Sequence, residues 1–258
     1  LLANKTVSEF VDKQRIGKAP VPFPYRVHDI PDVEKLKPFV AFASRFGHRF
    51  DLSTPLTIAR SFNKMIARSE HKADQAFLHA LGIRTMAKAV YTTENIGHYG
   101  LQFPYYSHFT SPIRRYPDML AHRILLSCLQ EQPKNRKDLE TQCQHCSERE
   151  RKAMEAERDG IRYYQALFMQ NHIGEEFQAV ISGVASFGFW AQTDPYRCEG
   201  LVAVQHLFHL DDFIFVEAEF ALIGKRSKLR FQMGQTVRIL VAGVDLAKRQ
   251  LDFEWIEP

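Results

Sequence analysis

The densest run of side chains that could do chemistry lies between residues 105 and 123. Its aromatic residues could stack on nucleobases, and Ser111 places a hydroxyl group at the start of a predicted helix. Arg114 and Arg115 would lie in the first turn of that helix. A helix N-terminus favours phosphate, and exposed basic side chains there oppose the helix dipole by about 0.3–1 kcal/mol each unless they have a partner. The pattern therefore indicates a phosphodiester held bidentately by Arg114.

A second interpretation of the same residues stays open. Arg115 could pair with Asp118 or with another surface acid, and the neighbouring aromatic rings could belong to a hydrophobic core. A short isolated pattern does not distinguish a phosphate site from a structural ion pair.

The sequence around these arginines resembles the signature of the ribonuclease II/ribonuclease R (RNB) family, and the form PIRRYPD is closer to the ribonuclease R branch. The segments that carry the resemblance are HFTSPIRRYPDMLAHR at 108–123, YRVHDIPD at 25–32, GHYGL at 97–101 and the opening LLANKTV. The resemblance covers essentially the whole chain. It implies a processive 3′-to-5′ exoribonuclease, a hydrolase that degrades single-stranded RNA to nucleoside 5′-monophosphates. The alternative is a non-catalytic RNA-binding protein that kept the RNA channel and lost the chemistry.

The resemblance also implies roles for individual residues. Arg114 would be catalytic, neutralising charge on the scissile phosphate. Ser111 and Arg115 would hold the RNA backbone, and His108 and Tyr106 would line the channel. The family's Mg²⁺ ions are held by clustered aspartates that precede the opening helix, so this chain is expected to contribute no metal ligand. We accordingly expect a fragment whose partners are RNA and the missing N-terminal half of the same protein, and which does not hydrolyse RNA by itself.

Helical periodicity dominates residues 1–172, which we predict to be the C-terminal part of the RNB domain. Residues 91–111 look like strand and loop within this helical setting, because they are rich in aromatic residues and glycine. The predicted helices cover residues 1–11, 33–46, a segment beginning at 53 or 54 and reaching at least 66, 73–90, 112–129 and 139–170.

Residues 173–258 alternate between apolar and polar side chains and predict a five-stranded β-barrel, which makes the chain α+β. The predicted strands are 177–184, 187–193, 200–207, 236–245 and 249–256. The segment resembles the OB-fold RNA-binding domain of the ribosomal protein S-one type, although Ala203 stands where that family usually has histidine. Phe187 and Phe189 would share an RNA-facing side, unless one of them fills the barrel. The basic residues expected to bind RNA here are Lys225, Arg226, Lys228, Arg230 and Arg249.

Charge is divided unevenly along the 258 residues. Residues 1–172 carry a net charge of +8 and residues 173–258 a net charge of −4, within a total of +4. No apolar run approaches the ~20 residues that a membrane span needs. Four cysteines are too few for a secreted disulfide scaffold, which favours a reducing, cytoplasmic location. The pair Cys143 and Cys146 lacks a second pair nearby, so we do not interpret it as a zinc site.

Overall fold

The computed structural model describes residues 1–70 and 75–257. Two compact units are interleaved along the sequence: Leu1–Asp32 joins Met86–Glu155, and Val33–Thr85 joins Ala156–Pro258. The mixture of helices with a five-stranded sheet confirms the predicted α+β class. The division at residue 172 remains a prediction about domain organisation. None of the helices in the described residues is both long and apolar enough to cross a membrane.

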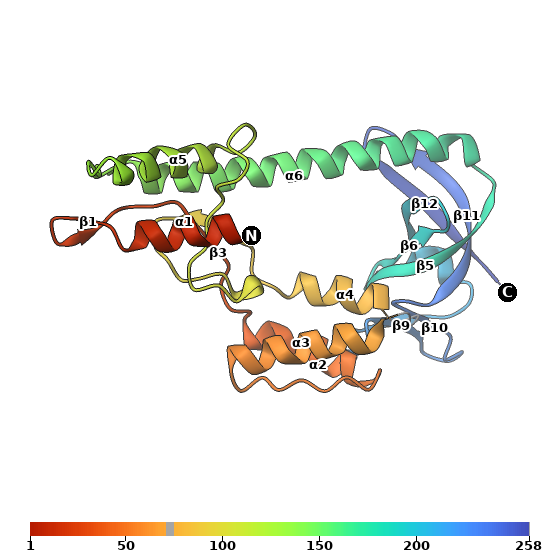
Figure 1. Ribbon diagram of the computed structural model, residues 1–258. Helices are drawn as coiled ribbons and strands as arrows, with labels where there is room; N and C mark the ends of the chain where they lie inside the picture. Colours follow the sequence, from red (N-terminus) through yellow and green to blue (C-terminus); the bar gives the residue numbers. More distant parts are fainter. Residues whose placement is uncertain (71–74, 258) are drawn as a thin grey trace. The chain divides into compact units, whose positions relative to one another are not determined.

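The first unit surrounds a small two-stranded sheet with helices (Figure 1). Its core is formed by apolar side chains that include Val11, Phe23, Leu120 and Ile124, and α1 and α5 pack against each other there. β3 pairs with β4 in antiparallel register. The elements are α1 (Leu2–Asp12), β1 (Arg15–Ile16), β2 (Ala19–Pro20), β3 (Tyr25–Val27), β4 (Val90–Thr92), η1 (Tyr99–Leu101), α5 (Tyr116–Leu129) and the first part of α6 (Leu139–Met169).

The second unit contains the helices of residues 33–85 and the β-rich C-terminal region. Its helices are α2 (Val33–Ser44), α3 (Pro55–Ser69) and α4 (Gln75–Arg84), followed later by the rest of α6, η2 (Gln170–His172), η3 (Val204–Leu207) and η4 (Glu217–Glu219). Its strands are β5 (Glu176–Ala185), β6 (Gly188–Thr193), β7 (Glu199–Ala203), β8 (Phe213–Val216), β9 (Ala221–Gly224), β10 (Arg230–Gln232), β11 (Thr236–Asp245) and β12 (Gln250–Ile256).

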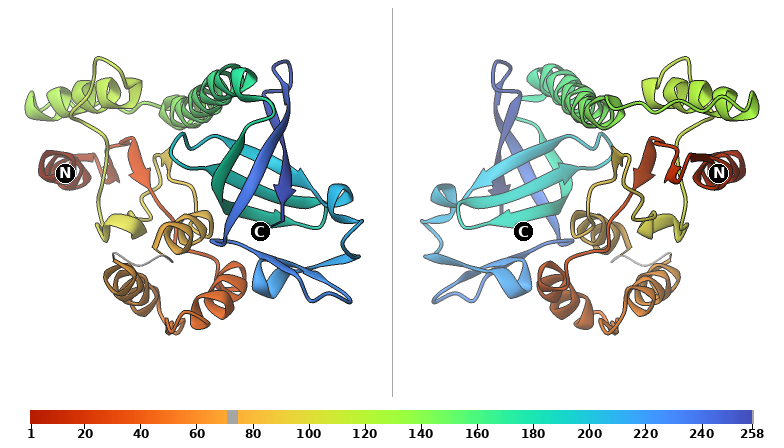
Figure 2. Two further views of the ribbon diagram at one scale, coloured as in Figure 1. Left: turned by 90° about the vertical axis from the view of Figure 1, so that its right-hand side faces the viewer. Right: turned by 90° about the vertical axis from the view of Figure 1, so that its left-hand side faces the viewer.

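Five of these strands close into a barrel in the order β11-β12-β7-β6-β5, which Figure 2 shows from two directions. The neighbours are antiparallel, except that β7 and β12 run parallel and close the barrel. Phe189, Phe231 and Phe253 fill the interior and are fully buried. Gly188 allows β6 to lie close to β7, because a Cβ there would be 2.3 Å from the carbonyl oxygen of Val202. Strands β8, β9 and β10 form a separate three-stranded sheet that the sequence pattern did not predict.

The helix predicted for 73–90 is shorter in the structure. Residues 73 and 74 lie outside the described residues, and α4 ends at Arg84. The N–H and the hydroxyl of Thr85 both donate to the carbonyl of Gly82, at 3.2 and 2.7 Å, where the helix ends. Val90–Thr92 then form β4, as β-branched and aromatic residues favour.

Candidate functional site

The turn that carries Arg114 precedes α5 and is not part of it. The prediction of a helix from residue 112 was wrong, because α5 begins at Tyr116 with Arg115 as its N-cap. Pro117 explains the difference: proline is tolerated in the first helical turn but would clash inside a helix that began at residue 112. Residues 111–115 instead form a turn in which the N–H groups of Arg114 and Arg115 donate to the carbonyl of Ser111, at 3.3 and 3.1 Å.

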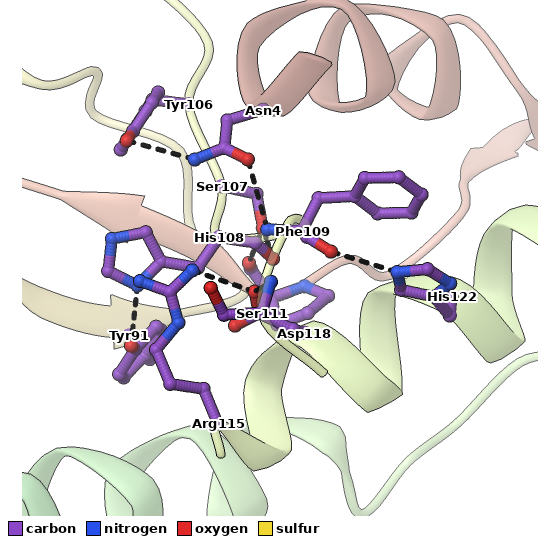
Figure 3. A network of polar contacts seen from close by, with 11 residues as sticks. Asn4, Tyr91, Tyr106, Ser107, His108, Phe109, Ser111, Arg115, Asp118 and His122 are labelled. Carbon is purple, nitrogen blue, oxygen red and sulfur yellow. Dashed lines mark hydrogen bonds and ion pairs between the residues drawn. The ribbon is translucent and has the colours of Figure 1, made fainter. Parts of the chain in front are cut away.

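A buried carboxylate holds this turn in place. Asp118 is fully buried in the first turn of α5, and its Oδ1 accepts hydrogen bonds from the N–H of Ser111 and the guanidinium of Arg115, both at 2.8 Å (Figure 3). The structural alternative considered for Arg115, an ion pair with Asp118, is therefore present. The pair also compensates the unfavourable position of Arg115 at a helix N-terminus, where Asp118 is favourable.

Arg114 has different surroundings. Its side chain is exposed and, among the described residues, takes part in no hydrogen bond or ion pair. The preceding side chain, Ile113, is completely exposed. A guanidinium that is free on a fixed turn can offer two parallel N–H groups to a phosphate.

Tyr106, which is predicted to line the channel, is buried in the structure. It is 5% exposed, and its hydroxyl accepts a hydrogen bond from Nδ2 of Asn4 at 3.1 Å. Oδ1 of Asn4 accepts from the N–H of Phe109 at 3.2 Å, so this buried amide joins α1 to the segment before the turn (Figure 3). The ring of Tyr106 packs edge-on against His98 and His108, which leaves little of it available to a ligand.

His108 is half-buried and uncharged near neutral pH. Its Nδ1 lies 2.7 Å from the hydroxyl of Tyr91, and burial, followed by the positive charges of Arg115 and Arg26, lowers the pKa of His108 to about 4. An uncharged imidazole can contribute hydrogen bonds or ring contacts to a ligand but adds no positive charge beside a phosphate.

Arg26 and Asn4 are polar residues of the site that the sequence analysis did not single out. Arg26 binds Glu150 at 2.7 Å, and its guanidinium lies over the ring of Tyr91, 4.5 Å from its centroid. Both residues lie in segments that were quoted for the family resemblance, at 25–32 and in the opening LLANKTV. Their roles depend on partners more than 60 positions away, which no local pattern reveals.

In the second unit the two phenylalanines expected to share an RNA-facing side are separated. Phe187 lies in the turn before β6 and is 53% exposed, whereas Phe189 is fully buried and stacks on Phe231 at 4.8 Å. The alternative that one of them fills the barrel is therefore correct for Phe189. Strict alternation does not hold across a turn, because β6 begins only at Gly188.

Trp190 of β6 is the aromatic neighbour of Phe187. The two rings meet edge-to-face at 5.3 Å, and Trp190 also lines a cavity of about 460 Å³. Lys35 of α2, Arg84 of α4 and Arg162 of α6 line the same cavity. These three cations are far apart in the sequence, so composition and spacing could not group them.

The predicted basic cluster is divided by its ion pairs. Arg230 is paired with Glu219, Lys225 lies 3.6 Å from Asp212, and Arg249 lies 3.2 Å from Asp159. The side-chain cations of Arg226 and Lys228 form no ion pair with a carboxylate in the part of the chain that the structure describes, and Nζ of Lys228 donates to the carbonyl of Lys225 at 3.0 Å.

Asp211 fixes the turn that carries these two side chains. It accepts the N–H groups of Arg226 and Ser227 at 2.8 and 2.6 Å, and these bonds lower its pKa to about 2.

The residues present do not fit a magnesium ion. Across residues 1–70 and 75–257, no group of three or more His, Cys, Asp or Glu side chains is placed to hold a metal. Oδ1 of Asp118 is already bonded to two donors, and burial raises the pKa of the Cys143 thiol to about 12, which keeps it protonated. We therefore derive no step through a metal at these residues.

The sequence and the structure of this chain are similar to those of known proteins. Residues 1–131 match the family model described as RNB domain. The chain is 36% identical to ribonuclease R of Aquifex aeolicus, over 99% of the chain and 36% of that protein, and 33% identical to ribonuclease R of Escherichia coli, over 99% and 32%. It thus spans about a third of the length of these curated relatives. The structure of Mycoplasma genitalium RNase R in complex with ribose methylated single-stranded RNA matches 99% of this chain and 40% of its own, with a TM-score of 0.87 and 25% identity.

Proposed function

This chain belongs to the RNB domain family, and from that membership we propose that it is the RNA-binding C-terminal part of an exoribonuclease of the ribonuclease R type. The proposed reaction of the complete protein is processive 3′-to-5′ hydrolysis of single-stranded RNA to nucleoside 5′-monophosphates. The metal ligands of that reaction are assigned to an aspartate-bearing segment outside this sequence. Its cytoplasmic location remains a prediction.

The observation that carries the proposal is the exposed guanidinium of Arg114, which has no partner among the described residues and lies on a turn fixed by a buried carboxylate. A phosphodiester carries its charge on two nonbridging oxygens, which match the parallel N–H groups of arginine. Negative charge increases on these oxygens as a nucleophile attacks, so a preorganised cation there stabilises the transition state more than the bound substrate. Arg115, whose guanidinium is paired with Asp118, and Ser111, whose side chain is partly exposed at the start of the turn, would contact the RNA backbone beside Arg114.

A second part of the proposal concerns the barrel unit. Phe187 and Trp190 offer adjoining aromatic surfaces, and Arg226 and Lys228 offer cations without carboxylate partners among the described residues. Aromatic side chains beside a basic surface are the usual means by which OB-type barrels bind single strands. We assign base stacking to the first pair and backbone contact to the second.

The test separates binding from hydrolysis. The chain of residues 1–258 is mixed with a 5′-fluorescein-labelled single-stranded oligoribonucleotide in about 5 mM Mg²⁺. Fluorescence anisotropy measures binding, and denaturing gels of the same samples measure the length of the RNA. We expect salt-dependent binding without shortening of the RNA. Shortening would show that the chain holds a complete active site, and absence of binding at low salt would refute the RNA-binding role.

The complete protein distinguishes the enzyme from the non-catalytic alternative. We expect it to shorten the same RNA stepwise from the 3′ end, and a 3′-phosphorylated or 5′-labelled substrate reports the direction. Tight binding with full-length RNA recovered after prolonged incubation would favour a non-catalytic RNA-binding protein.

A further inference from the structure

Asp118 joins both ends of the turn that presents Arg114. The same oxygen, Oδ1, accepts the N–H of Ser111 at the first residue of the turn and the guanidinium of Arg115 at the last, each at 2.8 Å. The carboxylate is fully buried and lies on α5, whose core-facing neighbours Leu120 and Ala121 are also buried. The turn is therefore anchored to a packed helix through one atom.

The residues between the two anchors face outward. Ile113 is completely exposed and Arg114 is exposed, while the N–H of Arg114 donates to the carbonyl of Ser111 at 3.3 Å. The orientation of the Arg114 side chain thus depends on where Ser111 and Arg115 are held. No other side chain among the described residues bonds to the Arg114 guanidinium and could fix it instead.

The anchor also leaves polar atoms unsatisfied. Oδ2 of Asp118 and Nε of Arg115 are buried and have no hydrogen-bond partner in the described part of the chain. Unpaired buried polar atoms cost stability, so this ion pair is a poor choice for stability alone. The geometry of this ion pair is better explained by the position in which it holds the 111–115 turn.

We propose that Asp118 is a positioning residue, which holds the 111–115 turn so that Arg114 contacts an RNA phosphate. This role rests on the proposed function. It predicts an effect opposite to that of net charge alone. Asp118→Asn raises the net charge of the chain by one, which by itself would strengthen binding to RNA, a polyanion. We nevertheless expect the variant to bind RNA more weakly.

The experiment is a double-mutant cycle in the chain of residues 1–258, with a labelled single-stranded oligoribonucleotide and anisotropy at several KCl concentrations. Each phosphate contact with a single strand contributes about 0.7 to the slope of log affinity against log salt. We expect Arg114→Ala and Asp118→Asn each to reduce that slope by about 0.7, and the double variant to reduce it no further than Arg114→Ala alone. Thermal unfolding of each variant reports the folded fraction.

Asp12→Asn is the matched control. Asp12 is a half-buried carboxylate of the same unit that accepts the hydroxyl of Tyr25 at 3.0 Å, so its substitution changes the charge equally without touching the turn. We expect its affinity for RNA to be equal to or slightly higher than that of the unmodified chain.

The outcomes distinguish a wrong role for Asp118 from a wrong role for Arg114. If Arg114→Ala weakens binding and Asp118→Asn does not, the positioning role is wrong while the role of Arg114 stands. If Arg114→Ala leaves the salt slope unchanged, the proposed phosphate contact fails and the positioning role fails with it. An Asp118→Asn effect that persists in the Arg114→Ala background shows a general structural role and also overturns the proposal. Amide hydrogen exchange tests the anchor in the unmodified chain. The N–H of Ser111 should exchange slowly, and fast exchange there would contradict its hydrogen bond to Asp118.

Discussion

Arg114 and Arg115 are adjacent in the sequence but their guanidinium groups have different surroundings. Arg115 is bonded to a buried carboxylate, while Arg114 is exposed and unpaired among the described residues. The sequence left both outcomes open for Arg115, because a spacing of three residues to Asp118 permits an ion pair without requiring one. Phe187 and Phe189 show the same limit, since Phe187 lies in the turn before β6 and is exposed, whereas Phe189 lies within β6 and is buried.

Arg114→Ala in the complete protein should lower turnover at saturating RNA by about 10²–10³-fold, as loss of a preorganised transition-state contact does. RNA affinity should change by much less, since the substrate makes many other contacts. Single-turnover and steady-state rates on labelled RNA measure the two effects. Arg149→Ala, which removes another exposed arginine of the same unit, serves as the control. Equal losses of affinity and rate with turnover at saturation unchanged would contradict the proposed role.

At the scale of elements, the sequence pattern predicted the bounds of long, regular helices and strands. The long helix α6 and four of the five barrel strands agree with the predicted segments to within one residue at each end, because alternation and helical periodicity are visible within each of them. The strand predicted for 200–207 is shorter: β7 ends at Ala203, and Val204–Leu207 form η3. The predicted start of α5 and the predicted end of α4 were wrong: Pro117 lies in the first turn of α5, and Thr85 bonds to the carbonyl of Gly82 where α4 ends. The sheet of β8, β9 and β10 was missed because its strands have only three or four residues each.

The basic turn between β9 and β10 gives a prediction at this scale. Arg226→Ala/Lys228→Ala should reduce the salt slope of RNA binding by up to about 1.4, as expected for two phosphate contacts. Lys225→Ala/Arg230→Ala should reduce it less, because these cations already pair with Asp212 and Glu219. Anisotropy titrations at several salt concentrations compare the two double variants. Equal slopes would show that the ion pairs do not determine which cations meet RNA.

At the scale of the whole molecule, the two units differ in chemistry. The first unit holds a polar network whose partners come from α1, β3, β4 and α5, and the second holds a barrel with its own aromatic core. The segments quoted for the family resemblance contribute residues to this polar network. The resemblance did not predict that residues 33–85 belong with the barrel unit, because contacts between distant segments leave no periodic signal in either.

Two half-buried histidines, His98 and His108, make the stability of the first unit sensitive to acid. Burial, with the positive charges of His28 for His98 and of Arg115 for His108, lowers each pKa from 6.5 to about 4. The unfolded chain therefore binds more protons than the folded chain between pH 6.5 and 4, and the free energy of unfolding should fall as the pH falls through this window. Urea unfolding across this range should show a flatter dependence for His98→Gln/His108→Gln. The exposed His209→Gln should keep the original dependence, and the same flattening there would contradict the assignment.

The ring contact between Phe42 of α2 and Phe220, which follows η4 in the same unit, with centroids 5.1 Å apart, has a consequence for synthesis on the ribosome. Phe42 is translated about 180 residues before the partner that covers it, and at about 5–20 residues per second it waits on the order of 10–30 s. Throughout that interval α2 and its neighbours expose an apolar surface. The nascent chain is thus most vulnerable to aggregation and proteolysis before its final third has emerged, and slow codons placed within that third would lengthen the exposure.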